Sequence, residues 1–328
     1  MLSKLSTARK IIEHKLISNG WYAKKADKDF IILMYHGVDK VQDTRFNQRF
    51  YSRHNFEQQI AAFKKHFNIL TYEDLVKGNM SSKRTNVLLT FDDGYANNYT
   101  YALPLLDQYN MHALYFVTGV GSLAQKVLWA DAVDIVASYM KDNAQVKLNG
   151  ITFDLHKGAF ANKQLNMPLK TYIKASDRSG YAEKEQLITQ LLAIYDFTKS
   201  GELNDYWQLM TDQEINRASQ SKNITIGSHG FYHNNLGSLS TADAVSEVMQ
   251  SKQYLEGIIQ KEVTTIGFPD GSYTEELNDA LYKKGITHQF LVEYKYDDAG
   301  KRPYTYDRVG LYPMMGNNNE LLYKILRS

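Results

Sequence analysis

Short apolar runs alternate along this chain with segments that carry the period of an amphipathic helix, and this alternation limits the possible folds more than any other feature. Strands are predicted at 30–35, 86–91, 113–117, 224–228, 263–268, 287–293 and 306–311. Helices are predicted at 55–67, 97–109, 241–260 and 274–284, with cap-like residues at Asn55, Ser240 and Thr274. Such strand–helix–strand units predict an α/β fold with a mainly parallel sheet, which seven strands can close into a distorted barrel.

One stretch, from about residue 123 to residue 220, lacks the alternation. It holds a helix-like segment at 124–140, a hairpin at 146–155 with Asn149-Gly150 as its turn, and polar helical segments around 181–197 and 206–220. We expect an insertion subdomain between core strands, of the kind that shapes a binding cleft.

Composition excludes several classes of function. The 328 residues include 38 Lys+Arg and 36 Asp+Glu, so the formal net charge of +2 argues against nucleic acid as the main partner. The absence of cysteine excludes disulfide scaffolds, thiolate zinc sites and cysteine nucleophiles. The 24 tyrosines are typical of half-buried sheet positions, with stacking on sugars as the alternative.

The N-terminal residues carry no apolar run of the length that a secretory signal or a membrane span needs. Residues 1–29 are predicted to form a helical lead-in to a barrel of residues 30–328. Basic residues in segment 1–18 would suit an amphipathic helix on a membrane surface, although packing against the domain is favoured. The predicted location is the cytoplasm, with peripheral membrane contact as the alternative.

The first candidate for chemistry is TFDDGY at 90–95, directly after a predicted strand. Gly94 allows the chain to turn, and two neighbouring carboxylates, Asp92 and Asp93, need a cation or a shared proton. The carboxyl ends of strands form the active-site face of βα barrels, which favours a functional role. The alternative is a turn whose aspartate caps the helix at 97–109.

The second candidate is IGSHGFYHNNL at 226–236, which also follows a predicted strand. His229 and His233 are four residues apart, a spacing that predicts one face of a helical turn. Two neutral imidazoles at this spacing commonly bind one metal ion, and ordinary polar surface is the alternative.

The two candidates are stronger together than apart. One aspartate and two histidines make a three-ligand set with an open position for water, which is typical of catalytic metal sites. The other aspartate is then free to act as general base on the metal-bound water, and attack on a carbonyl would hydrolyse an amide or an ester.

These motifs resemble the signatures of the NodB-type polysaccharide deacetylases, carbohydrate esterase family 4. The segment ILMYHGV at 32–38 is similar to a first-strand pattern of many bacterial members, and residues 55–75 resemble the helix that follows it. GFPDGSY at 267–273 resembles a third motif. The resemblance covers roughly residues 30–122 and 211–312 and leaves the insertion out.

The resemblance implies a distorted (β/α) barrel of the NodB type that removes an N-acetyl group from a sugar in a polysaccharide, glycolipid or glycan precursor. It implies Asp92 as the catalytic base, and Asp93, His229 and His233 as ligands of one divalent metal ion, with zinc expected. The implied partner is an acetylated glycan or a lipid-linked sugar. Two alternatives stay open: a catalytically inactive glycan-binding relative, and an O-deacetylase or amidase that acts on a non-glycan substrate.

The third motif departs from the family pattern. Pro269 and Asp270 stand where many members have an arginine that orients the base, and Arg308 in the last predicted strand could take its place. Tyr95, Pro269, Asp270 and Arg308 are the residues predicted to bind substrate.

Many family members also have a histidine near the C-terminal motif as the general acid, and no histidine follows His288 in this chain. His288 itself is better explained as a half-buried structural histidine. His36, at the end of the first strand, is the candidate for an acid or for a partner of a metal ligand.

Overall fold

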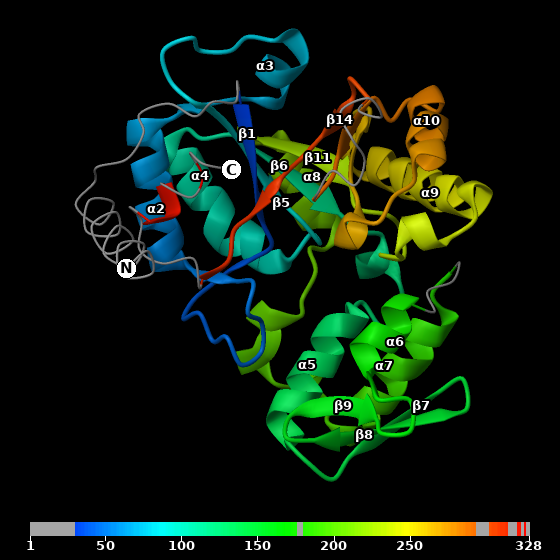
Figure 1. The fold of residues 1–328 in the computed structure, drawn as a ribbon. Helices are drawn as coiled ribbons and strands as arrows, with labels where there is room; N and C mark the ends of the chain where they lie inside the picture. Colours follow the sequence, from blue (N-terminus) through cyan, green and yellow to red (C-terminus); the bar gives the residue numbers. More distant parts are fainter. Residues whose placement is uncertain (1–29, 176–179, 293–301, 314–319, 323–324, 326–328) are drawn as a thin grey trace, which may run out of the picture.

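The structure is a computed structural model that describes residues 30–175, 180–292, 302–313, 320–322 and 325, so the predicted lead-in at 1–29 lies outside the described residues. Figure 1 shows a barrel domain above and a smaller insertion below it, at the carboxyl ends of the barrel strands. No helix in these described ranges is long and apolar enough to cross a membrane. The location of the protein stays a prediction.

A nine-stranded sheet in the order β14-β13-β12-β11-β6-β5-β1-β15, with β4 paired to β5, forms the barrel. Every pairing in it is parallel, as the sequence predicts. The strands are Phe30–Tyr35 (β1), Asn68–Ile69 (β4), Asn86–Phe91 (β5), Ala113–Val117 (β6), Ile224–Ser228 (β11), Thr265–Gly267 (β12), His288–Phe290 (β13), Thr305–Tyr306 (β14) and Val309–Gly310 (β15). A separate parallel pair consists of Val38–Asp39 (β2) and Tyr51–Ser52 (β3).

The single strand predicted at 306–311 is split in two. β14 pairs with β13 at one end of the sheet, whereas β15 pairs with β1 at the other. The chain therefore crosses the opening of the barrel between them, and Arg308 lies in this crossing.

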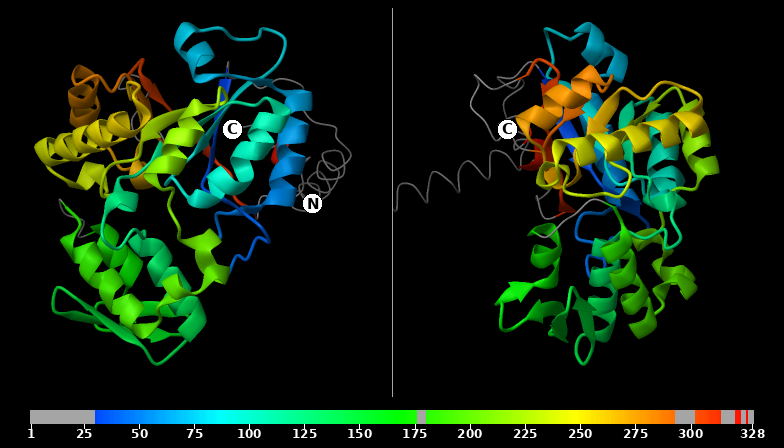
Figure 2. Two further views of the ribbon diagram at one scale, coloured as in Figure 1. Left: turned by 180° about the vertical axis from the view of Figure 1, so that it is seen from behind. Right: turned by 90° about the vertical axis from the view of Figure 1, so that its right-hand side faces the viewer.

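Helices cover the outside of the sheet, as the two views in Figure 2 show. They are Arg53–His66 (α2), Tyr72–Lys77 (α3), Leu103–Tyr109 (α4), which a π-helical turn at Asn98–Ala102 (η1) precedes, Asp212–Gln220 (α8), Thr241–Ile259 (α9) and Glu275–Lys283 (α10). Short 3-10 turns lie at Val120–Ser122 (η2), Leu236–Ser238 (η5) and Pro269–Gly271 (η6).

Two of the three expected helix caps are confirmed. The side chains of Ser240 and Thr274 accept hydrogen bonds from backbone amides in the first turns of α9 and α10. The prediction for Asn55 is wrong, because α2 begins two residues earlier and Ser52 is its cap, accepting the hydrogen bond from the Asn55 amide.

The insertion has its own sheet and a hydrophobic core, in which Phe153 and Leu187 are fully buried together with Phe50 and Tyr95 of the barrel part of the chain. Its elements are Trp129–Met140 (α5), Gln145–Leu148 (β7), Ile151–His156 (β8), Ala159–Asn162 (β9), Met167–Pro168 (β10), Leu169–Ala175 (α6), Ala182–Ile194 (α7), Phe197–Lys199 (η3) and Gly201–Tyr206 (η4). The four strands are antiparallel neighbours in the order β10-β9-β8-β7. The expected hairpin turn is present, since Asn149 and Gly150 both have the positive φ that a tight two-residue turn requires.

Helix α8 belongs by packing to the barrel, although its sequence lies in the stretch expected to form the insertion. Ile215 and Ala218 are buried in the barrel core together with Ile226 of β11. The insertion core itself extends only as far as Tyr206.

Candidate active site

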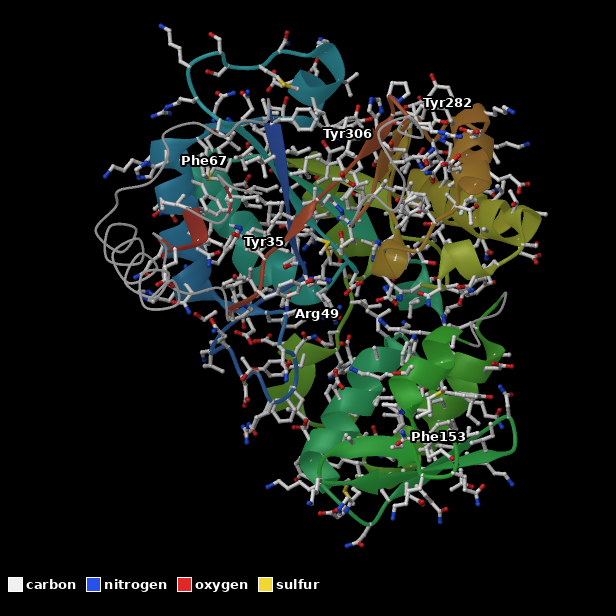
Figure 3. The ribbon with its side chains drawn as sticks, in the orientation of Figure 1. Tyr35, Arg49, Phe67, Phe153, Tyr282 and Tyr306 are labelled. Carbon is white, nitrogen blue, oxygen red and sulfur yellow. The ribbon has the colours of Figure 1, made fainter. Side chains whose placement is uncertain are left out.

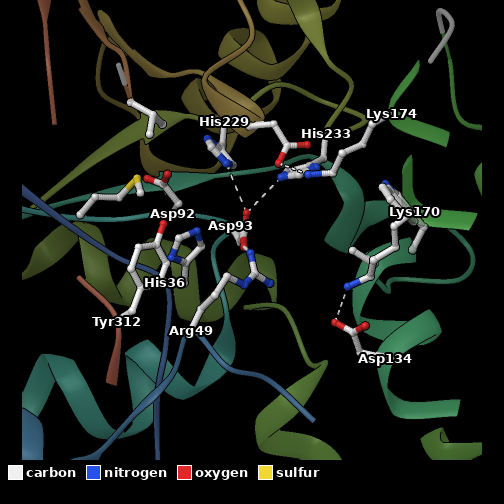
Figure 4. Close-up of a pocket in the computed structure, with 15 residues that line it drawn as sticks. His36, Arg49, Asp92, Asp93, Asp134, Lys170, Lys174, His229, His233 and Tyr312 are labelled. Atoms are coloured by element: carbon white, nitrogen blue, oxygen red, sulfur yellow. Dashed lines mark hydrogen bonds and ion pairs between the residues drawn. The ribbon is translucent and has the colours of Figure 1, made fainter. Parts of the chain in front are cut away.

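A cavity of about 360 Å³ lies at the carboxyl ends of the barrel strands, between the barrel and the insertion (Figure 4). β1, β5 and β11 end there, so His36, the two adjacent aspartates and His229 follow directly from buried strands. The lining residues are Met34, His36, Arg49, Asp92, Asp93, Trp129, Ala130, Asp134, Lys170, Lys174, His229, His233, Asp270, Val292 and Tyr312.

The turn after β5 separates the two carboxylates. Asp93 and Gly94 both have positive φ, of 73° and 83°. A Cβ on residue 94 would lie 2.9 Å from Cγ1 of Val117, so only glycine fits this turn. Asp92 consequently faces Arg308, and Asp93 faces the two histidines.

Asp93, His229 and His233 bring three metal-binding atoms to one point. Oδ1 of Asp93 lies 3.2 Å from Nε2 of His229 and 3.1 Å from Nε2 of His233, and all three atoms lie within 4.8 Å of one another. Nδ1 of His229 donates to the carbonyl oxygen of Gly267 at 2.7 Å, so when the ring is neutral its Nε2 is the nitrogen with a free lone pair for a metal ion. One carboxylate and two imidazoles suit zinc or a similar divalent ion, with a coordination position left open.

The two histidines do not lie on a helical turn, so that prediction is wrong. They lie in the loop at 229–235, where Gly230 (φ 71°) and His233 (φ 54°) both have left-handed backbones. This loop folds the chain back on itself, and the two rings lie 5.1 Å apart between centroids.

Asp92 and Arg308 form a fully buried ion pair in which the guanidinium binds both carboxylate oxygens, at 2.6 and 2.9 Å. Arg308 also donates to the carbonyl oxygen of Leu291 and to Oγ1 of Thr90, so it is fixed on three sides. It does not line the cavity, so the structure places it behind Asp92 and away from the cavity surface, where the sequence predicts a residue in contact with substrate.

Both aspartates are held in the ionised form. Burial acts to raise the pKa of Asp92, but the Arg308 guanidinium outweighs it and the pKa lies below its ordinary value. Burial opposes ionisation of Asp93 as well, but hydrogen bonds from His229 and His233 and the charge of Arg49 hold its pKa well below the usual range.

Of the other residues predicted to bind substrate, only Asp270 lines the cavity, and its carboxylate pairs with Nζ of Lys174 at 2.5 Å. Pro269 precedes it in the chain and is buried, and it does not line the cavity. Tyr95 is fully buried, and its hydroxyl donates to Asp131 at 2.7 Å, so the structure places this residue beneath the site and not in it.

His36 borders the cavity, with its ring stacked on Tyr312 and its Nδ1 buried without a hydrogen-bond partner. Burial and then the charge of Arg49 lower the pKa of His36 to about 4. The ring is therefore neutral near pH 7, which argues against an acid role. His288 lies away from the cavity, where its Nδ1 is 2.9 Å from the hydroxyl of Tyr72.

Arg49 is a site residue that sequence reasoning missed. Its Nη1 donates to Oδ2 of Asp93 at 3.1 Å, and its Nη2 donates to Oδ1 of Asp131 at 3.1 Å and to the hydroxyl of Tyr95. Asp131 belongs to α5, so Arg49 joins Asp93 to the insertion, at the junction of the two parts (Figure 3). No local motif marks Arg49, because its contacts with Asp93, Tyr95 and Asp131 lie 44 or more residues further along the chain.

The insertion supplies the wall that faces the metal-binding group. Lys170 and Lys174 lie one turn apart on α6, and Nζ of Lys170 pairs with Asp134 of α5 at 2.5 Å. Trp129, at the start of α5, adds an apolar surface. The cleft-shaping role expected of the insertion agrees with this arrangement.

The family model described as polysaccharide deacetylase matches residues 79–171 and 179–288. The putative polysaccharide deacetylase YxkH of Bacillus subtilis is 24% identical over 201 residues, which cover 50% of this chain and 66% of that protein, just under two thirds. The deacetylase PplD of Streptococcus pyogenes, solved in complex with acetate, has a similar structure, with a TM-score of 0.58, 16% identity and coverage of 92% of this chain and 99% of that one. IcaB from Ammonifex degensii is similar with a TM-score of 0.55, 15% identity and coverage of 92% and 99%. At these identities, the similarity to solved structures shows the fold.

Proposed function

Because this chain belongs to the polysaccharide deacetylase family, whose model matches more than half of its length, we propose that it is a metal-dependent hydrolase that removes an N-acetyl group from a sugar. The observation that carries the proposal is the convergence of Asp93, His229 and His233 in one cavity, beside the separately held carboxylate of Asp92. A simple binding site for sugars has no need of this combination.

The metal ligands in this proposal are Asp93 Oδ1, His229 Nε2 and His233 Nε2, and the proposed ion is zinc or another divalent cation. Such an ion supplies Lewis-acid chemistry when bound, polarising water and the amide carbonyl. Arg49 neutralises the second oxygen of Asp93, so that the first oxygen is turned toward the two imidazoles.

Asp92 is the proposed general base. Arg308 fixes both of its oxygens and keeps it ionised at neutral pH, so it is ready to accept the proton of the attacking water. A carboxyl with a lowered pKa also gives up a proton readily. We therefore propose that Asp92 returns the same proton to the nitrogen that leaves when the C–N bond breaks, giving the free amine of the sugar and acetic acid, which ionises to acetate in solution.

The proposed substrate is an acetylated glycan. The cavity volume of about 360 Å³ lies in the range of about 300–1,000 Å³ that is usual for small-molecule sites, and it suits one sugar ring with its acetamide. Trp129 gives this cavity an aromatic surface, of the kind that sugar rings stack on.

Two variants test the division of roles among these residues. Asp92→Asn should abolish acetate release from N-acetylated oligosaccharides while about one equivalent of metal is retained, because the ligand set is intact. His233→Ala should lose both metal and activity, and His156→Ala, at an exposed histidine, is the matched control. Equal metal loss in the first two variants would contradict the assignment of Asp92 as base. Release of acetate only from O-acetylated compounds would indicate an esterase, and binding of sugars without release would indicate an inactive relative.

A further inference from the structure

We propose that Lys184, on the insertion helix α7, is a positioning residue for the metal ligand His233, and that it acts together with Glu247 of the barrel helix α9. The proposal rests on the proposed function in one respect, which is that His233 binds a metal ion.

His233 needs support from outside its own loop. It has a left-handed backbone (φ 54°), which is unfavourable for a residue with a Cβ, and it lies in a segment without regular secondary structure. Its ring nevertheless has to meet Asp93 and His229 at one point. Contacts from other elements must therefore stabilise this conformation.

Glu247 supplies the first support. This residue is only 3% exposed. Its Oε1 accepts hydrogen bonds from the backbone amides of Tyr232 at 3.0 Å and Asn234 at 3.4 Å. Oε2 accepts a further bond from Nδ2 of Asn234 at 2.8 Å. The residues on both sides of His233 are thus bound to one carboxylate.

Lys184 supplies the second support, from the insertion. Its Nζ donates to the backbone carbonyl of His233 itself, at 3.1 Å, and to Oδ1 of Asn234. Lys184 is only 5% exposed, and lysines are rarely buried to this extent unless they are paired. Its partners lie 49 and 50 residues further along the chain.

The fully buried side-chain amide of Asn234 joins the two charges, since it accepts from Lys184 and donates to Glu247. Removal of the ammonium group would leave Oδ1 of Asn234 without this donor and Glu247 without its nearby positive charge. Neither Lys184 nor Glu247 lines the cavity, so an effect of either on the metal must act through the loop.

The test is the Zn²⁺ affinity of the full chain, measured by competition with a chelator, together with the absorption spectrum of the Co²⁺-loaded protein. Lys184→Met keeps the aliphatic stem and removes the donors. It should weaken Zn²⁺ binding by about 10- to 100-fold, the usual effect of changing a residue that orients a ligand, and should alter the Co²⁺ spectrum. Lys184→Arg should restore part of the affinity. Lys147→Met makes the same change at an exposed position of the insertion and should leave affinity within about twofold of the wild type.

The melting temperature of the metal-free protein separates positioning from a merely structural role. If the Lys184→Met variant has a lower melting temperature but binds Zn²⁺ as tightly as the wild type, Lys184 only attaches the insertion to the barrel and the proposal is wrong. If this variant does not fold, Glu247→Gln takes its place, and an unchanged affinity there would overturn the proposal as well. A wild-type chain that binds neither Zn²⁺ nor Co²⁺ would instead overturn the proposed function, on which this inference rests.

Discussion

The guanidinium group of Arg308 holds Asp92 by two parallel hydrogen bonds, although 216 residues separate them in the sequence. This geometry needs the planar fork of arginine, which a lysine ammonium group cannot reproduce. In the third motif of this chain, where many family members have the arginine that orients the base, Asp270 is paired with Lys174 instead.

Arg308→Lys should therefore reduce kcat on the order of 100-fold, because the base loses its fixed orientation, while KM stays close to the wild-type value. A change in kcat without a change in KM is expected because Arg308 does not line the cavity. Steady-state kinetics of acetate release on one N-acetylated oligosaccharide would measure both. An increase in KM with kcat unchanged would show that Arg308 contributes to binding and does not orient the base.

Arg49→Met should weaken metal binding by about 10- to 100-fold, since Asp93 loses the donor to its second oxygen and Asp131 loses its cationic partner. Burial already raises the pKa of Asp131 to about 7 against the opposing charge of Arg49, so its carboxyl should be protonated in the variant. Metal titration followed by calorimetry is the measurement. Arg45→Met, at an exposed arginine four positions earlier, serves as the control, and an equal loss in both variants would contradict a specific role for Arg49.

His36→Gln should leave the shape of the pH profile of kcat/KM unchanged between about pH 5.5 and 8. Burial and the charge of Arg49 lower the pKa of His36 to about 4, so the ring is already neutral throughout this range and its charge does not change. The profiles of wild type and variant on the same substrate provide the comparison. If the wild-type profile of kcat/KM has an inflection near pH 6.5 that the variant lacks, His36 does act as the general acid and this prediction is wrong.

Asp279→Asn should lower the melting temperature at pH 7 and have a decreasing effect as the solution is acidified. Hydrogen bonds from Arg302 and Tyr304 lower the pKa of Asp279 to about 2, compared with about 3.9 in an unfolded chain. A lowered carboxyl pKa stabilises the fold above the unfolded value, and this contribution disappears as the pH falls through the folded value. Thermal melts between pH 2 and pH 7 should show the melting temperatures of wild type and variant approaching each other as the pH falls. Glu276→Gln, at an exposed position on the same helix, should have a melting temperature close to that of the wild type at every pH.

The centre of the fold could be predicted from the sequence because its strands are continuous apolar runs. The bounds predicted for β1, β5, β6 and β11 match the structure, and each of these strands has neighbours on both sides in the sheet. The predictions were less accurate toward β14 and β15, where the chain crosses the opening of the barrel and Asp307 and Arg308 separate two short strands that have different partners.

Prediction of the site succeeded where a motif is local and failed where the contact is distant. Asp93, His229 and His233 come together as their motifs indicate, but a spacing of four residues fits a helical turn and a folded-back loop equally well. Tyr95 follows Gly94 in the motif, yet the turn directs its ring beneath the site. Arg49 and Lys184 lie in no motif and meet their partners only through the fold.

The insertion is joined to the barrel both by its hydrophobic core and by its polar contacts. Phe153 lies in the same buried cluster as Phe50 and Tyr95, which belong to the barrel part of the chain. Asp131 on α5 and Lys184 on α7 each bind a residue of the barrel that is next to or part of the group of Asp93, His229 and His233. A barrel trimmed of its insertion would therefore lose the partner of Arg49 and the support of His233 at once. Transplanting the insertion to another barrel of this kind would require the arginine at position 49 and the loop at 229–235 to be transferred with it.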